Sequence, residues 1–466
     1  MDANITKTLK SGVWYTVSNF CLKGIVFLTT PIFTRLLTQA EYGIFSNFTS
    51  WLNILMVITT LNVEATLISA RYEYEDKLDG YIKSVLLLSL LSTTAWWMIV
   101  SFFMDKVQTW VDMPALYIHL MFVYLFTLPA INLFQTRERF FYRYKISVAL
   151  SMTLSIGSSL LSVVLVILMS DSLTGRIVGY VLPNVIIGGA LVVYLFRVGG
   201  KIVITYWKEA LKIVLPFIPH LLSLTMLNQT DRIMITKICG ETDTALYSLA
   251  YNVAMIITLL LTSLNGAFSP WLGEKLAMKD YLTIRKISKR YTMLFIYFAI
   301  GIMLFAPEIL LILGGKKYIE AKWLMIPIAM GCICQFIYTL FVNVEQFEKK
   351  TVGMAYASIS AAVLNLVLNA WLIPKYGYVA AAYTTLIGYL WLLLVHMYLV
   401  YRIKMSRVYS YRFIVIAVCT ALIIACFIGG LYQFLFARYL VAVIYIIVTL
   451  VFVWHYKGRI LELVKK

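Results

Sequence analysis

The chain has 466 residues, of which 61% are hydrophobic and only 13% are charged. Soluble domains carry about 25% charged residues, so this composition excludes an ordinary soluble enzyme or binding domain. The net charge of +18 suggests a nucleic acid partner. Most of the Lys and Arg residues, however, fall in alternate loops between apolar runs, which is the pattern of cytoplasmic loops in membrane proteins. The charge therefore indicates topology and contact with anionic membrane lipids, and we expect no nucleic acid partner.

Nearly all the apolar residues fall in runs of about twenty, the length of a helix that crosses a bilayer. The sequence thus predicts an all-α polytopic membrane protein with about fourteen transmembrane helices and both termini in the cytoplasm. We expect the first span to be an uncleaved helix, because no small-residue cleavage site follows it. The predicted spans are residues 12–34, 43–69, 82–104, 115–136, 146–170, 175–197, 213–236, 244–272, 291–314, 323–344, 353–373, 377–400, 413–436 and 438–456.

An internal repeat relates the two halves of the chain. Residues 35–46 return in weaker form at 237–248, and at this offset of 202 Ser46 is answered by Ser248. Six spans lie in each copy, so both copies enter the membrane in the same sense, and we expect two pseudo-symmetric six-helix bundles related by an axis along the membrane normal. The predicted domains are residues 1–200, residues 201–404 and an additional two-helix segment at 405–466.

Polar side chains share one face on several predicted spans, at the helical period of about 100° per residue. Such faces in both copies predict a central cavity that holds substrate, and hydrogen bonding between helices by Ser, Thr and Asn is the alternative. The candidate substrate-binding residues are Asn19 and Lys23 in the first span, Asn53 in the second, Asn228 and Arg232 in the seventh and Asn252 in the eighth.

Two cations inside spans are the most informative of these residues. A charge near the bilayer centre costs several kcal/mol, so it faces water or a partner. Lys23 and Arg232 lie seven repeat positions apart, which is roughly 10 Å along a helix. We expect them to form a staggered path for an anionic group. The alternative is two static buried ion pairs with Glu64 and Asp231.

Asp231 and Glu64 are also candidates for coupling transport to an ion gradient. A carboxyl group in a low-dielectric cavity can bind and release a proton, whereas a carboxylate locked to Arg232 would stay ionised. The sequence has no phosphate-binding glycine loop, so we expect no ATP site and coupling by a proton or sodium gradient. We also expect no catalytic residues, no metal site and no cofactor.

The remaining histidines and acids carry less information. His119, His220 and His396 are isolated in the sequence, so we expect them to pack within or beside the spans. Glu308 and Glu345 lie near span ends, where solvated or structural roles are expected. The six cysteines lie in or beside apolar spans without zinc-site spacing, so we expect small buried side chains.

Four segments carry a family resemblance. They read Leu9-Lys10-Ser11-Gly12, then Pro31-Ile32-Phe33-Thr34-Arg35-Leu36-Leu37, then Asn228-Gln229-Thr230-Asp231-Arg232, then Leu372-Ile373-Pro374-Lys375-Tyr376-Gly377-Tyr378. In this order they resemble bacterial polysaccharide flippases of the O-antigen and capsule type. These flippases belong to the multidrug/oligosaccharidyl-lipid/polysaccharide exporter superfamily. The resemblance covers most of the first twelve predicted spans, and the motifs are diffuse but occur in order.

The resemblance implies a transporter rather than an enzyme. It implies two six-helix bundles that alternate access and move undecaprenyl-pyrophosphate-linked oligosaccharide units across the cytoplasmic membrane in polysaccharide or lipopolysaccharide biosynthesis. A polysaccharide polymerase is then an expected partner. A cation-coupled multidrug exporter of the same fold is an alternative, although that branch prefers acids in its cavity. A membrane polymerase or ligase is a remoter alternative, disfavoured by the short outer loops.

Overall fold

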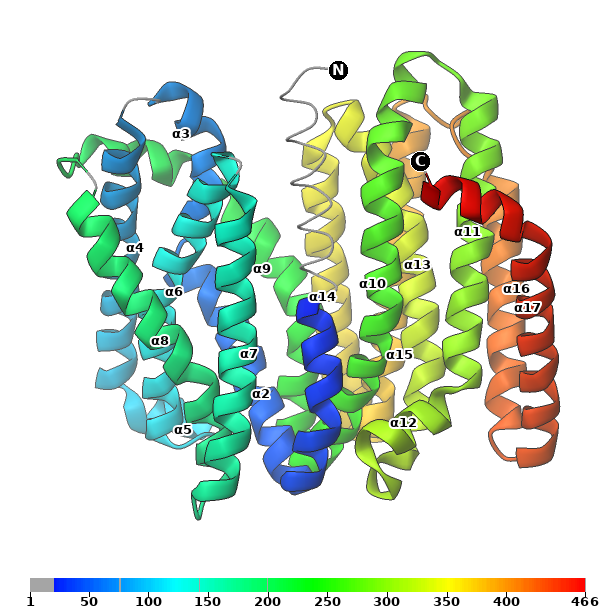
Figure 1. The fold of residues 1–466 in the computed structure, drawn as a ribbon, viewed down its shortest axis with the longest axis horizontal. Coiled ribbons are helices and arrows are strands. Elements are labelled where there is room, and N and C mark those ends of the chain that lie inside the picture. Colours follow the sequence, from blue (N-terminus) through cyan, green and yellow to red (C-terminus); the bar gives the residue numbers. More distant parts are fainter. Residues whose placement is uncertain (1–20, 75–76, 142, 199, 466) are drawn as a thin grey trace. The chain divides into compact units, whose positions relative to one another are not determined.

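The computed structural model describes residues 21–465 apart from 75–76, 142 and 199, and at 351 and 456–465 it describes only the backbone (Figure 1). Within this part every regular element is a helix, so the all-α prediction is confirmed. Among the described residues, twelve helices are long and apolar enough to cross a membrane, or up to thirteen if one bent pair counts as a span. The number fourteen stays a prediction, because the span predicted at 12–34 begins outside the described residues; of that region, 21–36 are helical.

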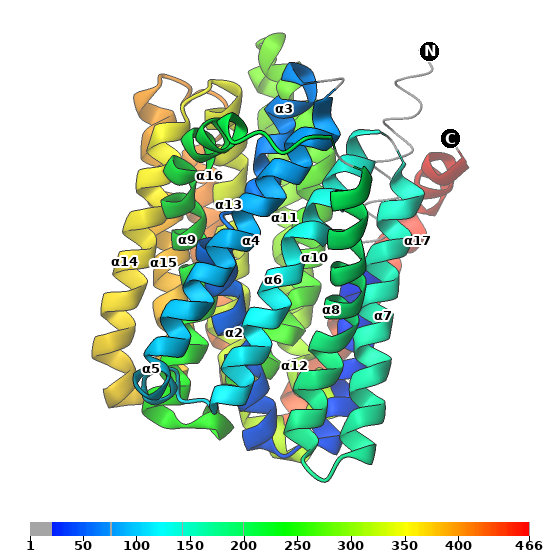
Figure 2. The same cartoon turned by 90° about the vertical axis from the view of Figure 1, so that its left-hand side faces the viewer.

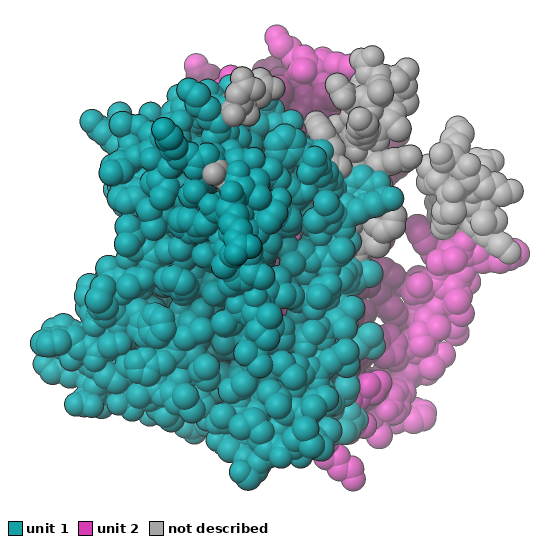
Figure 3. Space-filling model, turned by 60° about the vertical axis from the view of Figure 1, so that its left-hand side comes forward, with its two compact units in different colours: residues 1–248, 355–384 teal, residues 249–354, 385–466 magenta. Residues whose placement is uncertain are grey.

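The chain forms two compact units, coloured separately in Figure 3. Unit one comprises residues 1–248 and 355–384, and unit two comprises residues 249–354 and 385–466. The predicted domains 1–200, 201–404 and 405–466 follow the sequence repeat, and they stay a prediction.

Unit one contains the first half of the described helices and one later stretch, residues 355–384. Helices α6, α7 and α8 pack against one another, and Figures 1 and 2 both show them as neighbours. Beyond the helix at 21–36, its elements are α2 (Gln39–Thr59), η1 (Val63–Thr66), α3 (Leu67–Glu73), α4 (Leu78–Phe102), α5 (Met104–Val111), α6 (Ala115–Phe140), α7 (Tyr144–Leu168), α8 (Ser172–Val198), α9 (Thr205–Cys239), the start of α10 (Glu241–Ala277), most of α14 (Thr351–Tyr376) and the start of α15 (Tyr378–Arg402).

Small residues bring α7 and α8 close together. A Cβ atom at Gly179 would lie 2.3 Å from the Cα of Ser162, so no larger residue fits there without a shift. Polar bonds cross the same interface, with the Asn184 Nδ2 donating to the Ser158 Oγ at 3.1 Å. Close backbone approach through small residues is the usual way in which helices associate within a membrane.

The start of α2 is defined by a capping box. The Glu41 backbone N–H donates to the Thr38 Oγ1 at 3.2 Å, and the Thr38 N–H donates to the Glu41 Oε2 at 2.7 Å. Two backbone donors at the helix N-terminus are thereby satisfied. One turn later, a Cβ at Gly43 would lie 1.9 Å from the carbonyl oxygen of Glu241, so the first turns of α2 and α10 approach within backbone contact.

The second predicted span, 43–69, is interrupted rather than continuous. Leu61 and Asn62 have positive φ values of 58° and 48°, and the helices on either side of this break differ in direction by 48°. The carbonyl groups at the break accept from α4, because the Ser89 Oγ donates to the Thr60 oxygen at 2.8 Å. A broken helix is tolerated within a membrane when neighbouring side chains satisfy the freed backbone groups.

Unit two contains the rest of α10 and α15 and the C-terminal helices. Helix α16 packs against α11 and α13, and α17 packs against α11 and α16. The Tyr297 and Tyr445 rings stack at 4.6 Å, and the Arg438 guanidinium forms an ion pair with Glu308 at 2.5 Å. The additional elements are α11 (Tyr281–Leu304), α12 (Ala306–Gly314), η3 (Lys316–Ala321), α13 (Lys322–Phe347), α16 (Tyr411–Leu431) and α17 (Leu435–Lys465).

Candidate functional site

Asp231 lies at the centre of a buried polar cluster in unit one. Its side chain projects from α9 and is only 2% exposed. One carboxylate oxygen accepts from the hydroxyl of Tyr247, in the second turn of α10, and the other accepts from the Asn369 Nδ2 of α14 at 2.6 Å. The carboxylate therefore joins three helices whose residues are far apart in the sequence.

Further polar side chains bond to Asn369, the partner of this carboxylate. The Asn369 Nδ2 also donates to the Asn365 Oδ1, one helical turn earlier, at 3.1 Å. The Thr384 hydroxyl, on α15, donates to the Asn369 Oδ1. Asn365, Asn369 and Thr384 are at most 1% exposed. Buried polar groups of this kind persist only when hydrogen-bonded, because an unpaired one costs about 1–3 kcal/mol.

The chemistry of the cluster suits a small monovalent cation. It offers one carboxylate, two amide oxygens and two hydroxyls, which are hard oxygen donors. Among the described residues there is no group of three or more His, Cys, Asp and Glu side chains that could hold a metal ion. A single negative charge among neutral oxygens matches a proton or an alkali cation better than a transition metal.

The neighbouring Arg232 forms hydrogen bonds within its own helix, α9. Its Nη1 donates to the Asn228 carbonyl oxygen at 2.9 Å and to the Gln229 Oε1 at 3.2 Å, both within α9. The Asn228 Nδ2 in turn donates to the Leu224 carbonyl at 2.7 Å. Hydrogen bonds join each carboxylate oxygen of Asp231 to a neutral donor, Tyr247 or Asn369, and the alternative of a static ion pair stays a prediction.

The remaining predicted site residues are dispersed. Lys23 is half-buried on the helix at 21–36, and Asn53 is half-buried on α2. Glu64 follows the break in the second span, where its Oε1 accepts from the Asn132 Nδ2 of α6 at 2.9 Å. Asn252 is half-buried on α10 within unit two, and Asn19 lies outside the described residues. The roles assigned to these residues stay predictions.

Arg176, in the first turns of α8, was missed by the sequence analysis. Its guanidinium lies between two aromatic rings, 3.6 Å from the Phe33 centroid and 4.1 Å from the Phe45 centroid. Its Nε is buried and has no hydrogen-bond partner among the described residues. The sequence does contain a signal for this residue, because Arg176 falls within the predicted span 175–197 and a charge is unusual inside a membrane span.

A Glu–His pair in unit two was also missed. The Nδ1 of His396 on α15 lies 2.8 Å from the Glu345 Oε1 on α13, and both side chains are at most 4% exposed. The Tyr338 ring stacks on the imidazole at 5.5 Å. His396 thus packs among the spans as expected, and of the two roles expected for Glu345 the structure shows the structural one. The partners are 51 residues apart, so no local pattern connects them.

Comparison with known proteins defines the class of transporter. Residues 8–275 match the model of the polysaccharide biosynthesis protein family, and residues 216–371 match the MatE family. The structure is similar to a solved structure of the lipid II flippase MurJ in an inward closed conformation. The similarity covers 96% of this chain and 100% of the MurJ chain, with a TM-score of 0.68 and 13% sequence identity. The fold is thus that of a flippase-like transporter of the multidrug/oligosaccharidyl-lipid/polysaccharide exporter superfamily. The chain belongs to the polysaccharide biosynthesis protein family.

Two curated proteins are similar in sequence. "Lsg locus putative protein 1" from Haemophilus influenzae is 22% identical over 374 residues, which are 77% of this chain and 89% of that protein. "Probable low-salt glycan biosynthesis flippase Agl15" from Haloferax volcanii is 27% identical over 147 residues, 31% of each chain. The predicted membership of the superfamily of polysaccharide flippases is therefore confirmed.

Proposed function

We propose that this protein is a flippase for lipid-linked oligosaccharides, moving undecaprenyl-pyrophosphate-linked repeat units from the inner to the outer leaflet of a bacterial cytoplasmic membrane by alternating access. The match of residues 8–275 to the polysaccharide biosynthesis family carries the proposal. A relative named for glycan flipping supports it. The glycan would enter O-antigen, capsule or another polysaccharide, with a polymerase acting on the flipped unit.

Intramembrane cations supply the chemistry for a pyrophosphate. Lys23 is half-buried on the helix at 21–36, and Arg176 is held by Phe33 of the same helix and by Phe45. A cation on an aromatic face keeps its charge, so it can attract an anion that passes within reach. Pyrophosphate is the anionic group of the proposed substrate.

The Asp231 cluster is the proposed site of coupling to a sodium or proton gradient. Binding a cation there neutralises a buried carboxylate and reorganises hydrogen bonds from α9, α10, α14 and α15. A cation can drive a conformational change only by binding one state more tightly than the other. The three helices that the carboxylate joins, with α15 attached through the bond from Thr384 to Asn369, can provide such a difference in cation affinity when they move.

A multidrug exporter of the same fold is the second candidate, because residues 216–371 match the MatE family. Exporters of cationic drugs need acids in the cavity, whereas Lys23 and Arg176 are cations. The decisive experiment is deletion of the gene. Complete lipid-linked units should then accumulate on the inner leaflet, and unchanged distribution with new sensitivity to cationic drugs would favour the exporter. Single units accumulating on the outer leaflet would indicate a polymerase.

A further inference from the structure

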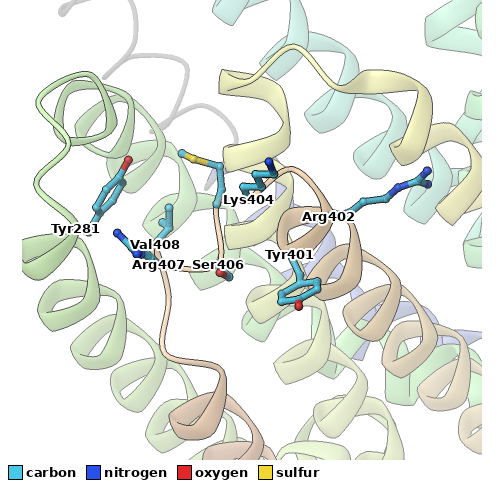
Figure 4. Close-up of a pocket in the computed structure, with 8 residues that line it drawn as sticks. Tyr281, Tyr401, Arg402, Lys404, Ser406, Arg407 and Val408 are labelled. Atoms are coloured by element: carbon cyan, nitrogen blue, oxygen red, sulfur yellow. The ribbon is translucent and has the colours of Figure 1, made fainter.

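A cavity of about 730 Å³ opens between the start of α11 and the loop that joins α15 to α16, within unit two. Its lining combines three cations with two tyrosines and a serine, and none of its lining residues is acidic. Figure 4 shows Arg402 extending away from the other labelled side chains, whereas Lys404 and Arg407 extend from the loop itself. The lining residues are Tyr281, Tyr401, Arg402, Lys404, Met405, Ser406, Arg407 and Val408.

The loop that carries these cations is held in one conformation. Lys404 has a positive φ of 63°, and its backbone N–H donates to the Tyr401 carbonyl at 3.0 Å. The Arg285 Nε donates to the Arg407 carbonyl oxygen at 2.7 Å, which ties the loop to α11. Near the end of the loop, Val408 and Tyr409 are at most 2% exposed. The cationic side chains therefore extend from a fixed backbone, which lowers the entropic cost of binding.

Charge and hydrogen bonding at the cavity favour a phosphate group. Lys404 and Arg407 are exposed, and neither forms an ion pair with any described side chain. Asp280 precedes the lining residue Tyr281 in the sequence, and its carboxylate caps α11 by accepting from the Thr283 N–H at 3.2 Å. Lys and Arg bind phosphate by charge-assisted hydrogen bonds, and Ser and Tyr hydroxyls can add neutral ones.

The surroundings of the cavity favour a lipid as the source of that phosphate. Tyr401 is 65% exposed and lies in the last turn of the apolar helix α15, where it is placed as an interfacial anchor. Leu282, next to Tyr281, is 79% exposed. Cations beside exposed apolar side chains at a span end match a molecule that has an anionic head and acyl chains.

We propose that this cavity is a specific site for the headgroup of an anionic phospholipid, with Lys404 and Arg407 binding its phosphate. The site is separate from the Asp231 cluster and from the proposed transport substrate. The proposal needs no transport activity, so its failure would not affect the proposed function.

Native mass spectrometry of the purified full-length protein tests the proposal by counting bound lipids. Phosphatidylglycerol should bind more tightly than phosphatidylcholine. The double variant Lys404→Gln with Arg407→Gln should bind phosphatidylglycerol roughly 25-fold more weakly, at about fivefold per cation. The matched control is Lys286→Gln with Arg290→Gln, which removes the same charge from exposed positions of α11 and should change affinity less than about twofold.

Three results would overturn the proposal. The first is equal binding of the two lipids, and the second is an equal loss of phosphatidylglycerol affinity in the control variant. The third is displacement of the lipid by inorganic phosphate at matched concentration, which would make free phosphate the ligand. If the double variant does not fold, the single variant Arg407→Gln replaces it, because its backbone carbonyl still accepts from Arg285. We expect about a fivefold weaker affinity from that single change, and an unchanged affinity would refute the site.

Discussion

The hydroxyl of Ser46 donates a hydrogen bond to the Ser248 Oγ at 2.5 Å, although the two serines are 202 positions apart. This separation equals the offset of the repeat predicted from the sequence, at which the two serines are equivalent positions. If the predicted repeat holds, its two-fold axis passes near this contact. The adjacent contact of Gly43 with Glu241 brings the same two helix starts within backbone distance.

A cross-link between these serines should stop transport. Alternating access requires helix ends that meet in one state to separate in another. We expect the double variant Ser46→Cys with Ser248→Cys, in a chain whose six native cysteines are replaced, to lose oligosaccharide flipping on oxidation and to recover it on reduction. Each single cysteine variant is the control. Full activity in completely cross-linked protein would contradict the proposed separation.

Removing the charge of Asp231 should uncouple transport from the cation gradient. Asp231→Asn keeps the shape of the side chain and loses the negative charge that a cation would neutralise. We expect the cation-driven flipping rate in proteoliposomes to fall by roughly tenfold or more, because coupling free energies are commonly 1–3 kcal/mol. Comparing sodium and proton gradients identifies the ion.

The matched control for that variant is Asp105→Asn on α5, because Asp105 is exposed and distant in sequence from the cluster. In this control variant, the flipping rate should depend on the cation gradient as it does in the unmodified protein. A cation response that survives in Asp231→Asn would place coupling elsewhere.

Arg176 should stabilise the packing of α8 against α2 and the helix at 21–36. Replacing it by Gln removes the cation from between Phe33 and Phe45, and we expect a loss of about 2 kcal/mol in unfolding free energy. Thermal or denaturant unfolding in detergent measures the loss. In a double-mutant cycle with Phe33→Leu the two effects should be coupled, and strictly additive effects would exclude the cation–π contact as their cause.

The buried pair of His396 and Glu345 should matter for stability. His396→Phe retains a ring against Tyr338 but leaves the Glu345 carboxyl without its imidazole partner. We expect unfolding free energy to fall by about 1–3 kcal/mol, the cost of an unsatisfied buried polar group. Tyr338→Phe, which keeps the stacked ring, is the control and should have a much smaller effect. If His396→Phe is as stable as the unmodified protein, the pair of His396 and Glu345 does not contribute to stability.

The N-terminus of α8 should show acid-dependent stability through Asp171. A hydrogen bond from the Thr174 hydroxyl, helped by the backbone N–H groups of Thr174 and Leu173, holds the pKa of the Asp171 carboxyl below its ordinary value of 3.8. A lowered pKa means that the stabilisation is fully present above the unfolded value and is lost as pH falls through the folded one.

We therefore expect Asp171→Ala to be less stable than the unmodified chain at pH 7 by about 0.5 kcal/mol, a low value because the side chain is exposed. The difference should shrink as the pH falls below about 3.8. Unfolding measured across this pH range checks the prediction, and a difference that grows on acidification would contradict it.

Much of the architecture could be predicted because its cause is local. Apolar runs of about twenty residues must form helices in a membrane, since lipid offers no partners to backbone N–H and C=O groups. The break at Leu61 and Asn62 was not predicted, because it depends on Ser89 of α4 to satisfy the Thr60 carbonyl. The Ser46–Ser248 contact agrees with the repeat that the sequence contains, although the bundle division derived from that repeat remains a prediction.

The sequence by itself determined that this is an all-helical membrane transporter and that Asp231 and Arg232 are unusual within a span. Only the tertiary structure decided the partners of those charges. Asp231 bonds to Asn369, which is 138 residues away, and Arg232 bonds to its own helix. The physical reason is that hydrophobic periodicity depends on neighbours three and four positions apart, whereas hydrogen bonds between helices depend on their rotation and packing, which the whole chain sets.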